Sequence, residues 1–123
     1  MSAQSTRKAI LNAKDAAAAG ANFALLLPPS YWPKALSNDA ILGYFRDVAD
    51  HSPIPIVIYN FPGVTSGVDL DSDQLSALAS HHNIVAVKLT CGNVGKVIRL
   101  TSKFTHEQFG VFGGSSDYLL PTL

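Results

Sequence analysis

The stretch IVAVKLT, Ile84 to Thr90, places a single lysine inside an apolar run, and the interpretation of the whole chain starts from it. Short β-branched, apolar runs are typical of strands, whose successive side chains point to opposite faces. Alternation predicts two sets of side chains: Ile84, Ala86 and Lys88 on one face, and Val85, Val87 and Leu89 on the other. An ammonium is rarely buried without a partner. Lys88 is therefore either a reactive amine held in a pocket or the point where a strand emerges into water.

Three more apolar runs accompany this stretch and alternate with helical patterns. The predicted strands are Phe23 to Leu27, Ile56 to Tyr59, Ile84 to Leu89 and Phe109 to Phe112. The predicted helices begin near Ser5, Ser37, Asp71 and Asn93 and end near Gly20, Asp50, His82 and Phe104. Asp71 with Gln74 resembles a capping box, and Asn93 can cap the helix that follows it. The final Tyr118 to Leu123 resembles the start of another helix. The repeat of about 30 residues is close to the roughly 31 residues of one unit in an eightfold barrel.

This alternation predicts an α/β fold with a parallel sheet, in one domain that spans residues 1–123. Two architectures fit the pattern: part of a (β/α)8 barrel, and a complete four-stranded doubly wound sheet. Both gather functional groups at the carboxyl ends of the strands. Tyr59, Lys88 and the GGSS turn at residues 113–116 all lie at such ends.

The composition limits the classes of partner. The chain is 47% hydrophobic and 15% charged, and nine basic residues balance nine acidic ones, which suits a globular protein and argues against nucleic acid as a partner. One cysteine excludes an intrachain disulfide. No run reaches the length of a membrane span and no leader pattern opens the chain, so we expect a cytoplasmic protein without a membrane partner.

Tyr59 and Lys88 are the first candidates for chemistry. Alternation places Tyr59 on the face of Val57, and neighbouring parallel strands lie about 4.8 Å apart, so the two side chains converge if their strands are adjacent. Desolvation favours the neutral form of a lysine amine, which attacks carbonyls to form a Schiff base, while a phenol beside it can shuttle protons. The alternative is a tyrosine bonded to the backbone beside a lysine that reaches into water.

The remaining candidates carry less chemistry. The four histidines lack the spacing of metal ligands, so we expect no metal, and Cys91 is expected to be a passive thiol. Backbone N–H groups of Gly113, Gly114 and Ser115 could bind a carboxylate or phosphate, or could simply form a turn. Tyr31 and Trp32 lie in a proline-rich loop, either exposed for binding or packed against a neighbouring helix.

YNFP at Tyr59 to Pro62 and VKLT at Val87 to Thr90, with tyrosine and lysine 29 positions apart, resemble the paired motifs of the dihydrodipicolinate synthase and N-acetylneuraminate lyase family. The resemblance implies part of a (β/α)8 barrel, about four βα units corresponding to strands 4 to 7. It implies that Lys88 forms a Schiff base with a 2-keto acid, pyruvate as product or donor, and that Tyr59 relays protons without any cofactor. It also implies that Gly113, Gly114 and Ser115 line the pocket, and that Tyr31 lies in a loop that crosses between subunits of homo-oligomeric full-length relatives.

One departure bears on the substrate. Dihydrodipicolinate synthases usually carry an arginine five positions after the motif tyrosine, whereas this chain has Val64. YNFPGVTSG and KLTCGNVGK are more similar to the 2-keto-3-deoxy-sugar-acid aldolases, especially those acting on L-threo-3-deoxy-hexulosonate in galacturonate breakdown, and to 4-hydroxy-2-oxoglutarate aldolases. The resemblance therefore implies aldol cleavage to pyruvate and an aldehyde.

A second departure is the absence of the family's G-T-T-G-E loop and of the segments for strands 1 to 3 and 8, so we expect a fragment with incomplete pocket walls. Two other functions stay open at this point. One is a non-catalytic remnant that associates through exposed strand edges. The other is a small phosphate or nucleotide binder that uses GGSS, although the chain has no P-loop and no GxGxxG.

Overall fold

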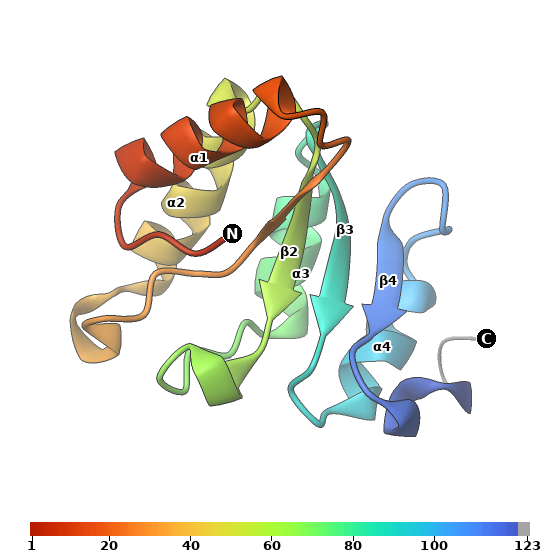
Figure 1. Cartoon of the computed structure of the whole chain (residues 1–123). Coiled ribbons are helices and arrows are strands. Elements are labelled where there is room, and N and C mark those ends of the chain that lie inside the picture. The colour runs from red at the N-terminus through yellow and green to blue at the C-terminus, as the bar shows by residue number, and fades with distance from the viewer. Residues whose placement is uncertain (121–123) are drawn as a thin grey trace.

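The computed structural model describes residues 1–120 and contains one sheet of four parallel strands. The strands are β1 (Ala24–Leu26), β2 (Ile56–Asn60), β3 (Ile84–Leu89) and β4 (Gly110–Gly113), and they lie in the order β1-β2-β3-β4. The strand ends of β2, β3 and β4 point to one edge, as Figure 1 shows. The predicted α/β alternation is confirmed. Of the helix predicted at the end of the chain, the described part is a short 3-10 turn, η3 (Ser116–Tyr118), and residues 121–123 lie outside the described residues.

Four helices cover one face of this sheet. They are α1 (Thr6–Ala18), α2 (Asn38–His51), α3 (Ser72–Ala79) and α4 (Val94–Thr101), with the 3-10 turns η1 (Pro33–Ala35) and η2 (Pro62–Val64) between them. Their buried residues form one core with the sheet, which includes Phe45 and Leu75 from the helices and Ile58 and Val87 from the strands. Figure 1 shows α3 and α4 behind β2, β3 and β4. Sequential strand order with helices on one face is the arrangement of a barrel segment, so the doubly wound alternative is wrong.

Local signals account for the helix ends. Ser5 and Ser37 accept hydrogen bonds from N–H groups of the first turns of α1 and α2, and Asp71 and Gln74 form the predicted capping box of α3. Gly20, with φ 92°, follows the end of α1 in a conformation that glycine adopts easily. The Asn93 side chain makes no capping bond. The prediction that it caps α4 is therefore wrong, and α4 ends at Thr101 rather than Phe104.

One irregularity in β3 corrects the predicted faces. Ile84 pairs with Ile56, but the next pair is Ala86 with Val57, so Val85 has no partner on β2. Ile84 packs in the core with Val87 and Leu89, whereas Val85 and Ala86 both line a cavity of about 270 Å³ on the opposite face. The prediction that Ile84 shares the face of Lys88 is wrong, because the bulge interrupts the period of two. Ala86 and Lys88 do share a face.

The face of the sheet opposite the helices, the bare face, carries exposed aromatic rings at both edges. Phe23 precedes β1 and is 59% exposed, so the predicted buried strand begins one residue later, at Ala24. Phe112 on β4 is 57% exposed. Within residues 1–120 no helix has both the length and the apolar character needed to span a membrane.

Candidate active site

Tyr59 and Lys88 are direct neighbours across β2 and β3, at the carboxyl edge of the sheet. The Lys88 Nζ lies 4.3 Å from the centroid of the Tyr59 ring, a cation–π distance. The predicted convergence of these two side chains is confirmed. Both are half-buried, so each has one side against the sheet and one side open to a ligand.

The surroundings of Lys88 contain no compensating acid. Among residues 1–120 no carboxylate lies within ion-pair distance of its ammonium. The Phe61 ring lies 5.7 Å from the Tyr59 ring, tilted by 37°, and Phe112 pairs with Lys88 from β4. The ring contact given for the amine itself is with the face of Tyr59. An amine without a carboxylate partner keeps its lone pair accessible whenever it is neutral, which is what attack on a carbonyl requires.

The turn after β4 approaches β3 closely. The Gly114 N–H donates to the Leu89 carbonyl at 2.7 Å, and a Cβ on Gly114 would lie 1.8 Å from Thr90 Oγ1. Glycine is needed here for close packing. Because the Gly114 N–H is already engaged, the prediction that it binds an anion does not fit this structure. Gly113 and Ser115 are exposed beside it, and their role as ligand contacts stays a prediction.

Thr90 is a residue at this edge that the sequence reading did not single out. Its Oγ1 is buried and, among the described residues, has no hydrogen-bond partner. A buried hydroxyl without a partner is uncommon and calls for an explanation. Its position two residues after Lys88 is a signal that could have drawn attention to it.

Tyr31 lies apart from the pair. Its ring is 74% exposed and meets the 72% exposed Trp32 edge to face, with centroids 5.2 Å apart. Its backbone N–H donates to the Gln4 side chain at 2.9 Å. The interpretation that these rings pack against a neighbouring helix is therefore wrong for the described chain. Tyr31 makes no hydrogen bond or ring contact with Tyr59, and its role in binding stays a prediction.

Comparison with known proteins assigns this arrangement to a family. The family model for the dihydrodipicolinate synthetase family matches residues 1–123. The chain belongs to this family. The family identified from the paired YNFP and VKLT motifs is thereby confirmed.

Two relatives and one solved structure show how the similarity is distributed. The chain is 54% identical over 121 residues to the "Probable 4-hydroxy-2-oxoglutarate aldolase, mitochondrial" of Emericella nidulans, covering 98% of this chain and 39% of that protein. It is 50% identical over 126 residues to the L-threo-3-deoxy-hexylosonate aldolase of Hypocrea jecorina, covering 97% and 40%. A crystal structure of a dihydrodipicolinate synthase family protein from Coccidioides immitis matches with a TM-score of 0.87 and 46% identity, covering 99% and 38%. The chain thus spans about two fifths of these proteins.

A polar cluster of Asn60, Asp69 and Lys96 lies on the helix side of the sheet, opposite the face that carries Tyr59 and Lys88. Asn60 and Lys96 are 0% and 4% exposed. The Asn60 amide donates to Asp69 Oδ1 at 2.8 Å, and the Lys96 ammonium donates to the same oxygen. Sequence reasoning missed this cluster, since a lone lysine on an amphipathic helix is usually solvated and its partner lies 27 residues away.

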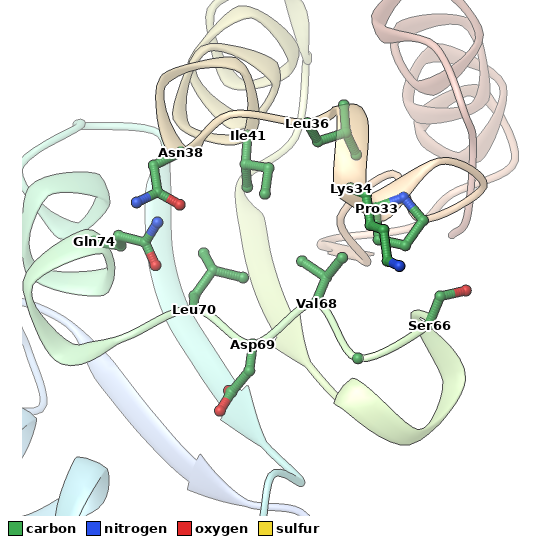
Figure 2. Close-up of a pocket in the computed structure, with 11 residues that line it drawn as sticks. Pro33, Lys34, Leu36, Asn38, Ile41, Ser66, Val68, Asp69, Leu70 and Gln74 are labelled. Carbon is green, nitrogen blue, oxygen red and sulfur yellow. The ribbon is translucent and has the colours of Figure 1, made fainter.

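A cavity in the loops near this edge is separate from the Tyr59 and Lys88 pair. It measures about 320 Å³ and lies between residues 33–41 and 66–74, with Lys34, Asn38 and Gln74 among its polar lining residues. Figure 2 shows Ile41, Val68 and Leu70 forming its apolar floor. Neither Tyr59 nor Lys88 lines it, so we do not assign it to their chemistry.

The side chains of Cys91 and Tyr118 meet at the end of the sheet. Cys91 Sγ lies 3.6 Å from the hydroxyl of Tyr118, which is 1% exposed. Burial, and then the bond to the Cys91 thiol, raises the pKa of the Tyr118 hydroxyl. Residues 1–120 contain no group of three or more His, Cys, Asp or Glu side chains that could hold a metal ion.

Proposed function

We propose that this chain carries the Schiff-base centre of a class I aldolase that cleaves a 2-keto-3-deoxy sugar acid to pyruvate and an aldehyde. The observation that carries the proposal is the Lys88 ammonium 4.3 Å from the Tyr59 ring on adjacent strands. Lys88 is the nucleophile and Tyr59 the proton relay in this proposal. The names of the two fungal relatives, both aldolases, support the reaction class.

The chemistry uses one amine and one hydroxyl. The neutral Lys88 amine attacks C2 of the keto acid, forming a C–N bond, and the carbonyl oxygen takes two protons, one of them from the amine nitrogen, and leaves as water. The resulting iminium accepts the electron pair of the C3–C4 bond as that bond breaks, while the C4 hydroxyl loses its proton and becomes the aldehyde. In this proposal Tyr59 carries these protons. Protonation of the enamine at C3 and hydrolysis release pyruvate and restore the amine.

Val64 supports a sugar-acid or hydroxy-keto-acid substrate over the second substrate of a dihydrodipicolinate synthase. Its side chain is 55% exposed in the turn after Tyr59, and it offers no cation for a second carboxylate. The alternatives within this proposal are a 4-hydroxy-2-oxoglutarate aldolase and a dihydrodipicolinate synthase-like enzyme. Gly113, Ser115 and Tyr31 complete the proposed substrate contacts.

Trapping tests the proposal directly. The chain is incubated with pyruvate and borohydride, digested, and mapped by mass spectrometry, and we expect a reduced pyruvyl adduct on Lys88. Lys88→Ala should remove the adduct, and Lys34→Ala, which changes a lysine of the neighbouring loop, should retain it. An adduct that persists in Lys88→Ala would contradict the assignment.

A second candidate of another class is supported by the bare sheet face. The edge strand β4 and the exposed Phe23 and Phe112 would suit association with another chain rather than catalysis. The outer edge of β1 is already bonded to Met1, through the Leu25 carbonyl and the Leu27 N–H. A folded sample that forms no adduct but assembles into larger species would favour this candidate. A cytoplasmic location stays a prediction, because the Emericella relative has "mitochondrial" in its name. A homo-oligomer also stays a prediction.

A further inference from the structure

Asn60 directly follows Tyr59 and bonds to two other segments of the chain. Its backbone carbonyl accepts from the Thr90 N–H at 2.9 Å, which extends the pairing of β2 and β3 past Lys88. Its side-chain oxygen accepts from the Leu70 N–H at 3.0 Å, and its amide donates to Asp69 at 2.8 Å. One buried residue thus links the end of Tyr59's strand, the end of Lys88's strand, and the segment that returns toward α3.

Lys96 closes this network from α4, eight residues after Lys88 in the chain. Its ammonium donates to the Asp69 carboxylate, the one ion pair that Lys96 makes among the described residues. Figure 2 shows Val68 and Leu70 directed toward Ile41, with the Asp69 carboxylate on the other side of the segment. The loop after Tyr59 and the helix after Lys88 therefore meet at one carboxylate.

The ion pair between Lys96 and Asp69 favours one position of the loop that carries Asp69. The Lys96 side chain is 5% exposed and that of Asp69 is 41% exposed, so the cation depends on the carboxylate much more than the reverse. An ammonium at that depth is strongly disfavoured without a partner. Any shift of residues 69–70 away from Asn60 would leave the charge of the Lys96 ammonium without its carboxylate partner. This cost keeps the loop packed against the helix side of the sheet.

We infer that Asn60, Asp69 and Lys96 are positioning residues that hold Tyr59 and Lys88 in reactive alignment. None of the three lies on the face that carries the pair, so they act through the backbone of β2 and β3. The inference rests on the proposed function for its catalytic consequence. Its structural content, the fixed contact between the Lys88 amine and the Tyr59 ring, is measurable without turnover.

The test compares Lys96→Met and Asn60→Ala with a matched control, Asp50→Asn. The control disrupts the ion pair between Asp50 and His81, which joins the end of α2 to the segment between α3 and the start of β3, away from the carboxyl ends of β2 and β3. Nuclear magnetic resonance reports the first readout: ring-current shifts of the Lys88 ε-methylene protons and their cross-peaks to the Tyr59 ring. The second readout is the rate of pyruvate trapping on Lys88.

We expect Lys96→Met and Asn60→Ala to lose the Lys88 ring-current shift and to trap pyruvate roughly tenfold to a hundredfold more slowly, because small misplacements of reacting groups have effects of that size. Asp50→Asn should keep both readouts, and Lys96→Arg, which retains the cation, should recover most of both. If Lys96→Met does not fold, the double variant Lys96→Met with Asp69→Asn, which removes both charges, takes the place of the single variant in the comparison.

The two proposals fail in different ways. If the native chain shows the ring-current shift but traps no pyruvate, the proposed function is wrong and the magnetic resonance comparison still decides the inference. If Lys96→Met and Asn60→Ala keep the native shift, or if Asp50→Asn loses it equally, the inference is overturned.

Discussion

The Lys88 ammonium contacts the face of the Tyr59 ring, with Nζ 4.3 Å from the ring centroid. A cation over an aromatic face is attracted by the π-electrons, independently of the hydroxyl. Two features of Tyr59 are therefore separable: the ring, which contacts the lysine side chain, and the hydroxyl, to which we assign the exchange of protons. Substitution can remove one property and keep the other.

Tyr59→Phe should separate these roles. The ring contact remains and the hydroxyl is lost, so we expect folding and the Lys88 ring-current shift to be retained while trapping of pyruvate slows by about 10² to 10⁴, the usual range for a general acid–base group. Tyr59→Leu should lose both the shift and the trapping. Asp47→Ala, which changes an exposed residue of α2 outside the proposed site, serves as the control. Equal trapping rates in native and Tyr59→Phe chains would remove the hydroxyl from the mechanism.

The convergence of Tyr59 and Lys88 could be predicted from sequence because it depends on two general rules. Parallel strands joined by helices end at one edge, and alternation fixes which side chains share a face near that edge. The capping box at Asp71 and Gln74 is equally local, since three residues contain all of its hydrogen-bonding groups. Features encoded within one element or by its period were thus accessible.

The features that escaped prediction are those set by residues far apart in the sequence. The bulge at Val85 depends on how β3 meets β2, and nothing within IVAVKLT marks it. The burial of Lys96 depends on Asp69, which reaches it only after the loop following β2 has folded back. The sequence leaves open whether Gly114 binds an anion or forms a turn, and only the proximity of Thr90 and Leu89 in the structure gives it a packing role.

Gly114→Ala tests that packing role. The added Cβ would lie 1.8 Å from Thr90 Oγ1 and 2.9 Å from the Leu89 carbonyl, so the turn or β3 must move. We expect a loss of about 1–3 kcal/mol in the free energy of unfolding, measured by urea denaturation. Gly43→Ala is the matched control, because no atom lies within 4 Å of its added Cβ in α2, and it should stabilise the chain by about 0.5–1 kcal/mol. Partial recovery in the double variant with Thr90→Ala would locate the clash.

The start of α3 gives a separate test of local stability. Asp71 accepts from the N–H groups of Asp73 and Gln74 at 2.9 and 2.8 Å, and Gln74 accepts from the Asp71 N–H at 2.9 Å. Asp71→Ala should lower the free energy of unfolding by about 1 kcal/mol, since the first turn loses its acceptor. Asp47→Ala, an exposed substitution within α2, should change it by less than about 0.5 kcal/mol. Equal effects of the two substitutions would argue that the cap contributes nothing specific.

Tyr44 predicts how stability changes at high pH. Its hydroxyl is buried between α2 and the N-terminal segment, donates to the Ala3 carbonyl at 3.3 Å, and has its pKa raised by burial above the ordinary value of 10.0. In the unfolded chain the phenol loses its proton near that ordinary value, while the folded chain retains it to higher pH. The stabilisation is therefore complete below about pH 10 and is lost as pH rises through the folded pKa.

The measurement compares urea midpoints at about pH 8 and about pH 10.5. Tyr44→Phe should be less stable than the native chain by about 0.5–1.5 kcal/mol at the lower pH, for the lost hydrogen bond, and should lose less stability between the two values. Phe45→Leu weakens the same helix but retains the phenol, so it should show the full alkaline loss. If Tyr44→Phe and Phe45→Leu lose stability equally on raising the pH, the alkaline sensitivity lies in other groups, of which the buried Tyr118, whose pKa is also raised, is the next to test in the same way.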